Sequence, residues 1–419
     1  MMKIQKVRLC KTICKKQKHG RRVSFLFGMV FLSTVMISPS PARSETPLGI
    51  EQIEQLYGAG QYQEVVKALG GSEDWNSAQS LYLGLSHLRL GNTLQTIKAW
   101  QNYVRLEQGS EGGRQISQYL TRLLKQEAAR NAKEQLIREK QLAARLDPKA
   151  IAVYPFKNKG SEAYAPLSKG LAAMVITDLS KVKGLTVVER IQIQAVLNEL
   201  KLAKSGIVDP ISTPRAGKLV GASKFTTGSL LDLDEEKMRI DATVTQTESG
   251  KQVSSVDTSG ELASFYTLQK MLVFKLLCGI GYCPESLDKQ TRLAIEKIHT
   301  KNFKAFRHYS EGLEFFDEED YRSAARSFVL ALEEDPDFAL ARKALLETPL
   351  LPLNTANILS GAEAAADNKS IPLPPASLLP PLVPAYRLPV PVTAKIFQQP
   401  PTTGGGQGTA PVTIEIEFP

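Results

Sequence analysis

Hydrophobic residues recur at helical spacing from residue 45 to residue 147, and Gly60 and Gly91 interrupt the pattern among polar neighbours. Apolar runs broken in this way predict short antiparallel helix pairs, followed by one long charged helix that ends at Asp147 and Pro148. The apolar side of that long helix is formed by Ile116, Leu120, Leu123, Leu124, Leu136 and Ile137.

The spacing of hydrophobic residues changes between residues 148 and 285. Short apolar runs typical of buried strands, beginning with Ile151–Phe156, alternate there with helical segments. Three strand-like runs follow across polar turns: SKFTTGSLLDL, KMRIDATVTQT and KQVSSVDTSG. A last helix is expected from after Gly260 to about Cys278. Strands that alternate with helices and then form a meander predict an α/β domain with a mixed sheet.

Residues 286–347 return to helical spacing and match the pattern of a 34-residue tetratricopeptide repeat. The matching positions are Gly312, Phe315, Asp320, Tyr321, Ala324, Phe328, Ala331 and Pro336. Glycine and alanine let paired helices approach, the aromatic rings fill the space between them, and the proline ends the second helix. A degenerate copy is predicted within residues 45–147, around Gly84 and Trp100. Because one or two copies cannot bury a continuous core, both should pack against other parts of the chain.

The last segment, residues 348–419, holds fourteen of the 24 prolines. This composition predicts an extended, disordered tail without regular helices, for which an inert spacer is the simplest role. The end of the tail, Val412–Phe418, alternates apolar and acidic residues as a half-buried strand does. Such a strand is a candidate for addition to an exposed sheet edge, in this protein or in a partner.

Charge is unevenly distributed along the chain. Ten of the 52 basic residues and none of the 43 acidic residues lie within the first 44 positions, so the net charge of +9 belongs to that segment. The nearly neutral remainder gives no argument for a nucleic-acid partner. Val23–Ile37 is an uncharged apolar run of 15 residues behind the basic stretch. This layout predicts a signal peptide over residues 1–44. An uncleaved anchor is the alternative, although a membrane span usually needs about 17 to 25 apolar residues.

The four cysteines fall into two pairs. Cys10 and Cys14 lie in the basic leader, whereas Cys278 and Cys283 stand five positions apart around a glycine-rich turn. In an oxidising compartment this second pair is a candidate disulfide, and its short loop limits the stabilisation it can give. No histidine lies at ligand spacing from the cysteines, so no metal site is predicted.

Three polar features have both a chemical and a structural interpretation. The acidic run Asp232–Glu236 lacks the ligand spacing and central glycine of a calcium loop, which favours a solvated hairpin turn. Gly404–Gly406 lacks the Lys-Ser/Thr of a phosphate loop and is expected to be linker. Glu189 and Arg190 stand at a strand-to-helix junction, where such a pair more often caps a helix or anchors a loop. No catalytic residue and no cofactor-binding residue is predicted.

An ordered set of short motifs between residues 151 and 259 resembles the curli-secretion CsgG family. This family overlaps in fold with the amino-terminal domain of TolB and with outer-membrane activators of penicillin-binding proteins. The motifs are Ile151–Phe156, Gly170-Leu171, Val187–Arg190 with Leu197, Ser205-Gly206, Asp209-Pro210, Gly217–Ala222, Gly228-Ser229 and Thr247–Gly250.

The resemblance implies a non-enzymatic scaffold in the periplasm, in some members associated with the outer membrane. It would act in envelope assembly or secretion by binding other envelope proteins or peptides. The resemblance also allows a homo-oligomeric ring. Two features depart from the family. No cysteine follows the leader to carry a lipid, and the connections between Leu185 and Gly260 are too short to supply the membrane-crossing strands of about 9 to 11 residues that a pore needs. A pore-forming channel subunit and an activator of a cell-wall enzyme are the alternatives. No integral membrane span is expected in the mature chain.

Overall fold

The computed structural model describes residues 49–71, 74–139, 146–200, 212–234, 236–350, 355–367, 393–395 and 415–417. The predicted signal peptide over residues 1–44 lies outside these ranges. Among the helices of the described residues, none combines the length and the apolar character that crossing a membrane requires.

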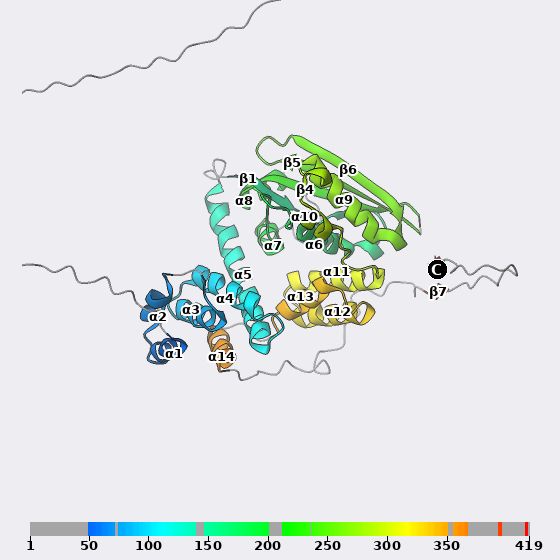
Figure 1. The fold of residues 1–419 in the computed structure, drawn as a ribbon. Helices are drawn as coiled ribbons and strands as arrows, with labels where there is room; N and C mark the ends of the chain where they lie inside the picture. The colour runs from blue at the N-terminus through cyan, green and yellow to red at the C-terminus, as the bar shows by residue number, and fades with distance from the viewer. Residues whose placement is uncertain are drawn as a thin grey trace, which may run out of the picture. The chain divides into compact units, whose positions relative to one another are not determined.

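A mixed sheet of six strands lies in the middle of the chain (Figure 1). Its strands are β1 (Asp147–Val153), β2 (Lys157–Asn158), β3 (Thr186–Val187), β4 (Ala222–Asp232), β5 (Lys237–Gln246) and β6 (Gln252–Glu261). Strand β1 pairs in parallel with β3 and β4, and β2 also pairs in parallel with β4. Strands β4, β5 and β6 form an antiparallel meander. The order β3-β1-β4-β5-β6 confirms the predicted α/β class with a mixed sheet.

Side-chain periodicity explains these strands. In β5 the residues Met238, Ile240, Ala242 and Val244 are buried, and the residues between them are exposed or half-buried. This alternation places every second side chain on the core face of the sheet. Strand β1 instead ends in an uninterrupted buried run, because the helices α6 (Leu167–Leu179) and α7 (Arg190–Glu199) both pack against this parallel strand.

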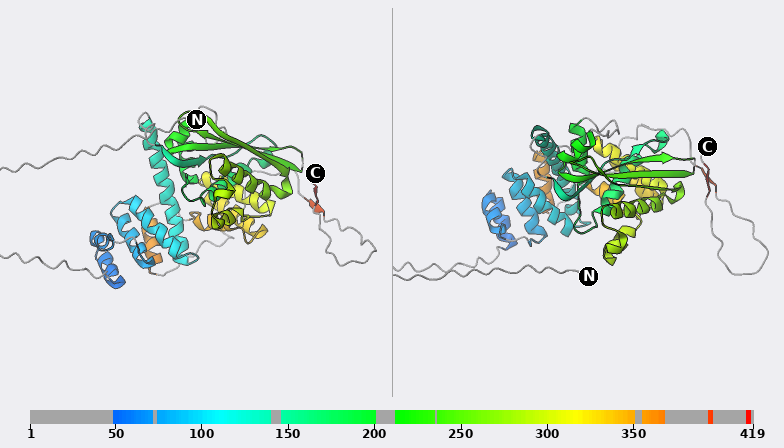
Figure 2. Two further views of the ribbon diagram at one scale, coloured as in Figure 1. Left: turned by 45° about the horizontal axis from the view of Figure 1, so that its top comes forward. Right: turned by 90° about the horizontal axis from the view of Figure 1, so that it is seen from above.

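Helices and short 3-10 turns connect and cover the strands. The helices are α6 (Leu167–Leu179), α7 (Arg190–Glu199), α8 (Ser212–Leu219), α9 (Phe265–Gly279) and α10 (Lys289–Glu296), and the turns are η2 (Glu162–Tyr164), η3 (Leu262–Ser264) and η4 (Pro284–Ser286). Helix α9 packs along β5 and β6, and α8 packs on β4 (Figure 2). Helix α6 lies against both α9 and α11 (Phe303–Asp317).

Three further helices share the hydrophobic core of this sheet. They are α11 (Phe303–Asp317), α12 (Tyr321–Glu334) and α13 (Ala339–Glu347). The same core cluster contains Ile151 and Phe225 of the sheet together with Phe328 of α12 and Ala341 of α13. The segments predicted as an α/β domain over residues 148–285 and a repeat over residues 286–347 therefore bury their apolar residues together.

The first five helices form a second core. They are α1 (Ile50–Gly58), α2 (Tyr62–Leu69), α3 (Ser77–Arg89), α4 (Thr93–Leu106) and α5 (Glu111–Ile137). Gly60 and Gly91 turn the chain between paired helices with φ of 74° and 75°. Trp100 is fully buried, and a Cβ atom on Gly84 would lie 2.2 Å from its indole ring. Helix α5 contributes to both cores, through Ile116 to this one and through Ala132 to the core of the sheet.

The end of α5 differs from the prediction. The helix stops at Ile137 rather than at Asp147 and Pro148. Asp147 instead begins β1, where its backbone N–H donates to the carbonyl oxygen of Gly221 at 3.0 Å. Pairing with β4 therefore competes successfully with continuation of the helix.

The prediction that residues 348–419 contain no regular helix is wrong for one segment. Helix α14 (Thr355–Ala366) forms there and packs on α3 and α5. It lies within the proline-free stretch between Pro352 and Pro372, which the average composition of the tail conceals. The predicted terminal strand is partly present as β8 (Glu415–Glu417), which pairs antiparallel with β7 (Thr393–Lys395) instead of with the main sheet. Gly404–Gly406 and the rest of the tail lie outside the described residues.

Candidate functional site

The residues of the predicted repeat meet between α11 and α12. A Cβ atom on Gly312 would lie 2.5 Å from Cε1 of Phe328, so only glycine lets the two helices approach this closely. Ala324, Phe328 and Ala331 are fully buried, whereas Phe315 and Tyr321 are partly buried against the same core. Pro336 follows the last residue of α12 by two positions. The packing is that of a tight helical hairpin, and its membership in the tetratricopeptide family stays a prediction.

The turn of this hairpin is held by charged residues from the α/β part. Asp317 accepts a hydrogen bond from Nη1 of Arg190 at 2.5 Å, and Nζ of Lys169 lies 3.2 Å from its other carboxylate oxygen. Burial would lower the pKa of Arg190, but the charge and hydrogen bond of Asp317 outweigh it and raise that pKa. Arg190 therefore anchors a neighbouring loop, which is the structural interpretation of the Glu189 and Arg190 pair.

Helix α5 holds the same turn from another side. Nζ of Lys125 donates to the carbonyl oxygen of Phe316 and to the hydroxyl of Tyr321, both at 3.1 Å, and lies 3.2 Å from a carboxylate oxygen of Glu319. The ammonium group also lies 5.1 Å and 5.0 Å from the ring centres of Phe316 and Tyr321. Contacts within the chain therefore occupy the turn end of the hairpin.

A buried cluster of polar side chains surrounds Asp178 of α6, which is completely buried. One carboxylate oxygen accepts hydrogen bonds from Nζ of Lys181 at 2.7 Å and from Nε2 of His299 at 3.1 Å. The other accepts from Nε2 of Gln269 at 2.9 Å and from Nζ of Lys270 at 2.7 Å. The cluster joins α6, α9 and the segment between α10 and α11. Both oxygens are occupied, so the arrangement serves structure and leaves no lone pair for a substrate.

The environment shifts the protonation of this cluster. Burial alone would raise the pKa of Asp178, but the hydrogen bond and charge of His299, the charge of Lys270 and the amide of Gln269 lower it overall. Burial lowers the pKa of His299, and Asp178 offsets this effect only in part. Burial likewise lowers the pKa of Lys270. The side chain of His299 is only 10% exposed, so protonating it places a further charge beside two lysines.

We expect His299 to make the fold sensitive to mild acid. The usual pKa of histidine is about 6.5 and the folded value is lower, so the unfolded chain binds more protons and stability falls as the pH drops through that region. Urea unfolding at pH 7.5 and at pH 5.5 should show a smaller loss of stability in His299→Gln than in the wild type. Burial also lowers the pKa of His87, which leaves part of the acid sensitivity in the variant. Equal losses in both proteins would contradict the prediction.

A cavity of about 500 Å³ lies between α5, α7 and α8. Its polar lining consists of Asn131, Gln135, Arg138, Gln192 and Lys218. Beside it, Arg215 of α8 binds both carboxylate oxygens of Glu139 at 2.7 Å and 2.8 Å. Among the described residues, the lining offers amides and cations but no carboxylate, so this part of the cavity suits a polar or anionic group better than acid–base chemistry.

Strand β6 forms an open edge of the sheet, since it pairs only with β5 among the described strands. The N–H of Leu262 donates to the carbonyl oxygen of Glu236 on the β5 side at 2.6 Å, and backbone direction alternates along an antiparallel strand. The backbone groups that point away from β5 are therefore those of Ser255, Asp257 and Ser259. In agreement, Nζ of Lys275 on α9 reaches the carbonyl oxygen of Asp257 at 2.6 Å. A lysine of this kind limits pairing at the centre of an edge and leaves its flanks open.

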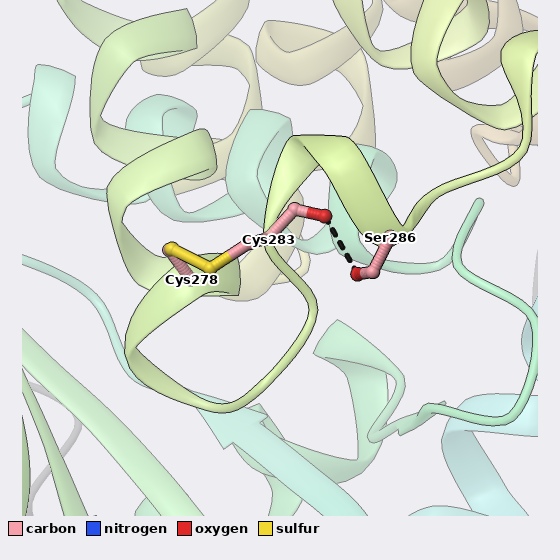
Figure 3. Close-up of a disulfide and its surroundings, with 3 residues drawn as sticks. All are labelled: Cys278, Cys283 and Ser286. Atoms are coloured by element: carbon pink, nitrogen blue, oxygen red, sulfur yellow. Dashed lines mark hydrogen bonds between the residues drawn. A yellow bond between two sulfur atoms is a disulfide. The ribbon is translucent and has the colours of Figure 1, made fainter.

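Cys278 and Cys283 form a disulfide in the structure (Figure 3). The bond closes the turn between α9 and η4, where Gly281 has φ of 93°. The hydroxyl of Ser286 donates to the carbonyl oxygen of Cys283 at 2.7 Å and supports the start of η4 (Figure 3). The disulfide therefore fixes a local turn rather than joining distant segments.

We expect reduction of this disulfide to have a modest effect. For so short a loop, the chain-entropy argument gives a stabilisation of about 2 kcal/mol. The Cys278→Ser/Cys283→Ser chain should lose about that free energy of unfolding in urea and keep its far-ultraviolet circular dichroism. Loss of the folded state in the variant would show that the bond holds more than the turn.

No group of three or more histidine, cysteine, aspartate or glutamate side chains is arranged to bind a metal within the described part of the chain. Asp178 and its partners were not predicted from the sequence. The available signal was an aspartate inside an otherwise apolar helix, but the histidine and lysine that meet it lie 121 and 92 positions away.

Part of the chain is similar to known proteins. Residues 130–261 match the family described as "Curli production assembly/transport component CsgG". Among solved structures, the chain is similar to the C-terminal domain of LpoB from Salmonella enterica, with 14% identity over 27% of this chain and 84% of that chain, at a TM-score of 0.23. It is also similar to lipoprotein GNA1162 from Neisseria meningitidis, with 18% identity over 32% of this chain and 96% of that chain, at a TM-score of 0.25. No curated protein matches the chain. The family match supports a CsgG-type domain at residues 130–261.

Proposed function

We propose that the protein is a non-enzymatic scaffold of the CsgG type that acts outside the cytoplasm, in the periplasm or at the outer membrane. It would bind other envelope proteins during envelope assembly or secretion. The match of residues 130–261 to the CsgG family carries this proposal. The basic and apolar layout of residues 1–44 supports export.

The open edge of β6 supplies a physical means of binding. An extended segment of a partner can add to a sheet edge through main-chain hydrogen bonds. The outward backbone groups of Ser255 and Ser259 flank the lysine-covered centre of this edge, so each can receive a partner strand. The same edge could join copies of this chain into a ring.

The test combines fractionation with an edge-blocking variant. The tagged full chain, expressed in its native cells, should be released by osmotic shock or alkaline carbonate and should co-purify with envelope proteins. A channel subunit would instead resist carbonate and require detergent. A chain that keeps Met1 and stays in the cytoplasm would contradict the proposal.

The variant Ser255→Pro/Ser259→Pro removes two outward N–H groups without touching the ladder to β5. We expect it to lose the partners that the wild-type chain captures. Its matched control, Ser255→Ala/Ser259→Ala, keeps both N–H groups and should retain them. Equal capture by both variants would show that the edge of β6 is not the binding surface.

A further inference from the structure

Helix α14 covers a surface of α3 and α5, together with Tyr57 of α1, that we call the α14 seat. The seat consists of Tyr57, Tyr82, Ser86, Arg89, Gln115 and Tyr119. On the other side of the contact, Gly361, Ala362 and Ala365 of α14 are buried. A Cβ atom on Gly361 would lie 1.6 Å from the hydroxyl oxygen of Tyr119, so the helix backbone rests directly on that side chain. Only a helix with a small-residue face can approach this closely.

The acidic residue of α14 is recognised specifically. Glu363 forms an ion pair with Arg89 and accepts a hydrogen bond from the hydroxyl of Tyr57 at 2.9 Å. Burial raises the pKa of Tyr57 to about 12, which keeps its hydroxyl protonated as a donor. The guanidinium of Arg89 also lies 6.0 Å from the ring centre of Tyr62. The seat therefore selects a helix with a carboxylate at this position.

The geometry of the helices places further polar residues in the seat. On α5, Gly112 faces Ala365 and Tyr119 faces Gly361. Gln115 lies between these two positions at helical spacing and so shares the covered face. On α3, Ser86 lies in the same way between Tyr82, which interacts with Asp367, and Arg89, which pairs with Glu363.

The described part of helix α14 provides no hydrogen-bond partner for three of the polar side chains that it covers. The hydroxyl oxygens of Ser86 and Tyr119 and the side-chain carbonyl oxygen of Gln115 are buried, and within the described structure none has a hydrogen-bond partner. The three side chains are 0%, 1% and 6% exposed, in the order Ser86, Tyr119 and Gln115. Leaving such atoms unpaired is costly, and the glycine and alanine side chains of α14 cannot pair with them.

We propose that the α14 seat is a docking site for a helix of a partner protein, and that α14 is the resident competitor for that site. The partner helix carries a carboxylate at the place of Glu363 and small hydroxyl-bearing residues on its buried face, which pair with the orphaned atoms. A second copy of this chain is disfavoured as the occupant, because its α14 would leave the same atoms unpaired. The seat is distinct from the edge of β6, so a partner helix can dock there whether or not a partner strand adds to that edge.

The first test asks whether the seat accepts a helix in trans. A fluorescent peptide of residues 354–368 is titrated with the full chain, and binding is followed by anisotropy. Because a tethered helix competes at high effective concentration, the peptide should bind at least about tenfold more tightly to a Gly361→Leu chain, in which α14 cannot rest on Tyr119. Ser360→Leu changes the exposed side of α14 and should behave as the wild type. If Gly361→Leu does not fold, Glu363→Lys provides a second release variant.

The second test asks for the chemistry of the partner. Two peptides differ only in carrying serine or the equally small aminobutyrate in place of Ala362 and Ala365. On the release variant, the serine peptide should bind about tenfold more tightly, and adding Arg89→Ala should weaken both peptides by about tenfold. Equal affinity of the two peptides would overturn the proposal, as would absence of binding to a folded release variant. The β6 proline variant tests the proposed function alone, and the peptide titrations test the α14 seat alone. Failure of one proposal can therefore be told from failure of the other.

Discussion

Replacing Asp178 by alanine should lower the free energy of unfolding by about 3 to 5 kcal/mol, because it leaves buried cations without their counterion. Lys270 is only 10% exposed, and its ammonium group lies 2.7 Å from Asp178. Lys181 loses its ion-pair partner at the same time and keeps its hydrogen bond to the carbonyl oxygen of Ala294. The helices α6 and α9 and the segment before α11 would lose their common polar contact. Urea unfolding followed by circular dichroism measures the effect.

Two variants separate the charge of Asp178 from its packing. Asp178→Asn keeps the shape and an acceptor but removes the charge, so its loss should be smaller than that of Asp178→Ala. In Asp178→Ala/Lys270→Met the second buried charge is also removed, and part of the lost stability should return, since replacing both partners is often neutral. If Asp178→Ala loses less than about 1 kcal/mol of unfolding free energy, the polar cluster around Asp178 contributes little to the stability of the fold.

Replacing Phe328 by alanine should cost about 3 to 5 kcal/mol of folding free energy, as expected for a fully buried aromatic ring. Its ring fills the space against Gly312 and lies 5.9 Å from that of Tyr309. Because Phe328 belongs to the same core as the sheet, the loss should extend beyond the helical hairpin. Phe315→Ala, at a partly buried position of the same hairpin, should cost less.

Two spectroscopic signals can show how far this loss extends. Both tryptophans, Trp75 and Trp100, belong to the core of the first helices, so their fluorescence reports that core alone. Circular dichroism reports the whole chain. Since α5 contributes to both cores, Phe328→Ala should shift both unfolding transitions to lower urea. A shift in circular dichroism without one in fluorescence would show that the two cores unfold independently.

Local patterns in the sequence predicted much of this fold. Strand β5 was predictable because Met238, Ile240, Ala242 and Val244 alternate with polar residues, and the helical hairpin was predictable from the spacing of Gly312 and Phe328. Helix α14 was not predicted, because its proline-free stretch is hidden within a proline-rich tail. The end of α5 was placed too late, because the pairing of Asp147 with β4 depends on tertiary structure.

The candidate sites depend more strongly on distant contacts. Asp178 gathers residues from three separate segments, and the α14 seat brings Glu363 to Arg89 across 274 positions. Hydrophobic period shows which face of a helix is buried, but it does not show which buried polar atoms find partners. The edge of β6 is an intermediate case, since the strand itself was predicted from the sequence and its place at the end of the sheet was not.

Helix α5 also determines how the protein can be divided for experiments. The CsgG match begins at Arg130, in the second half of this helix. A fragment that starts there would cut α5 in two. A fragment that ends there would remove Ala132 from the hydrophobic core of the sheet. Fragments whose boundaries follow the family match alone would therefore expose hydrophobic surface and tend to aggregate.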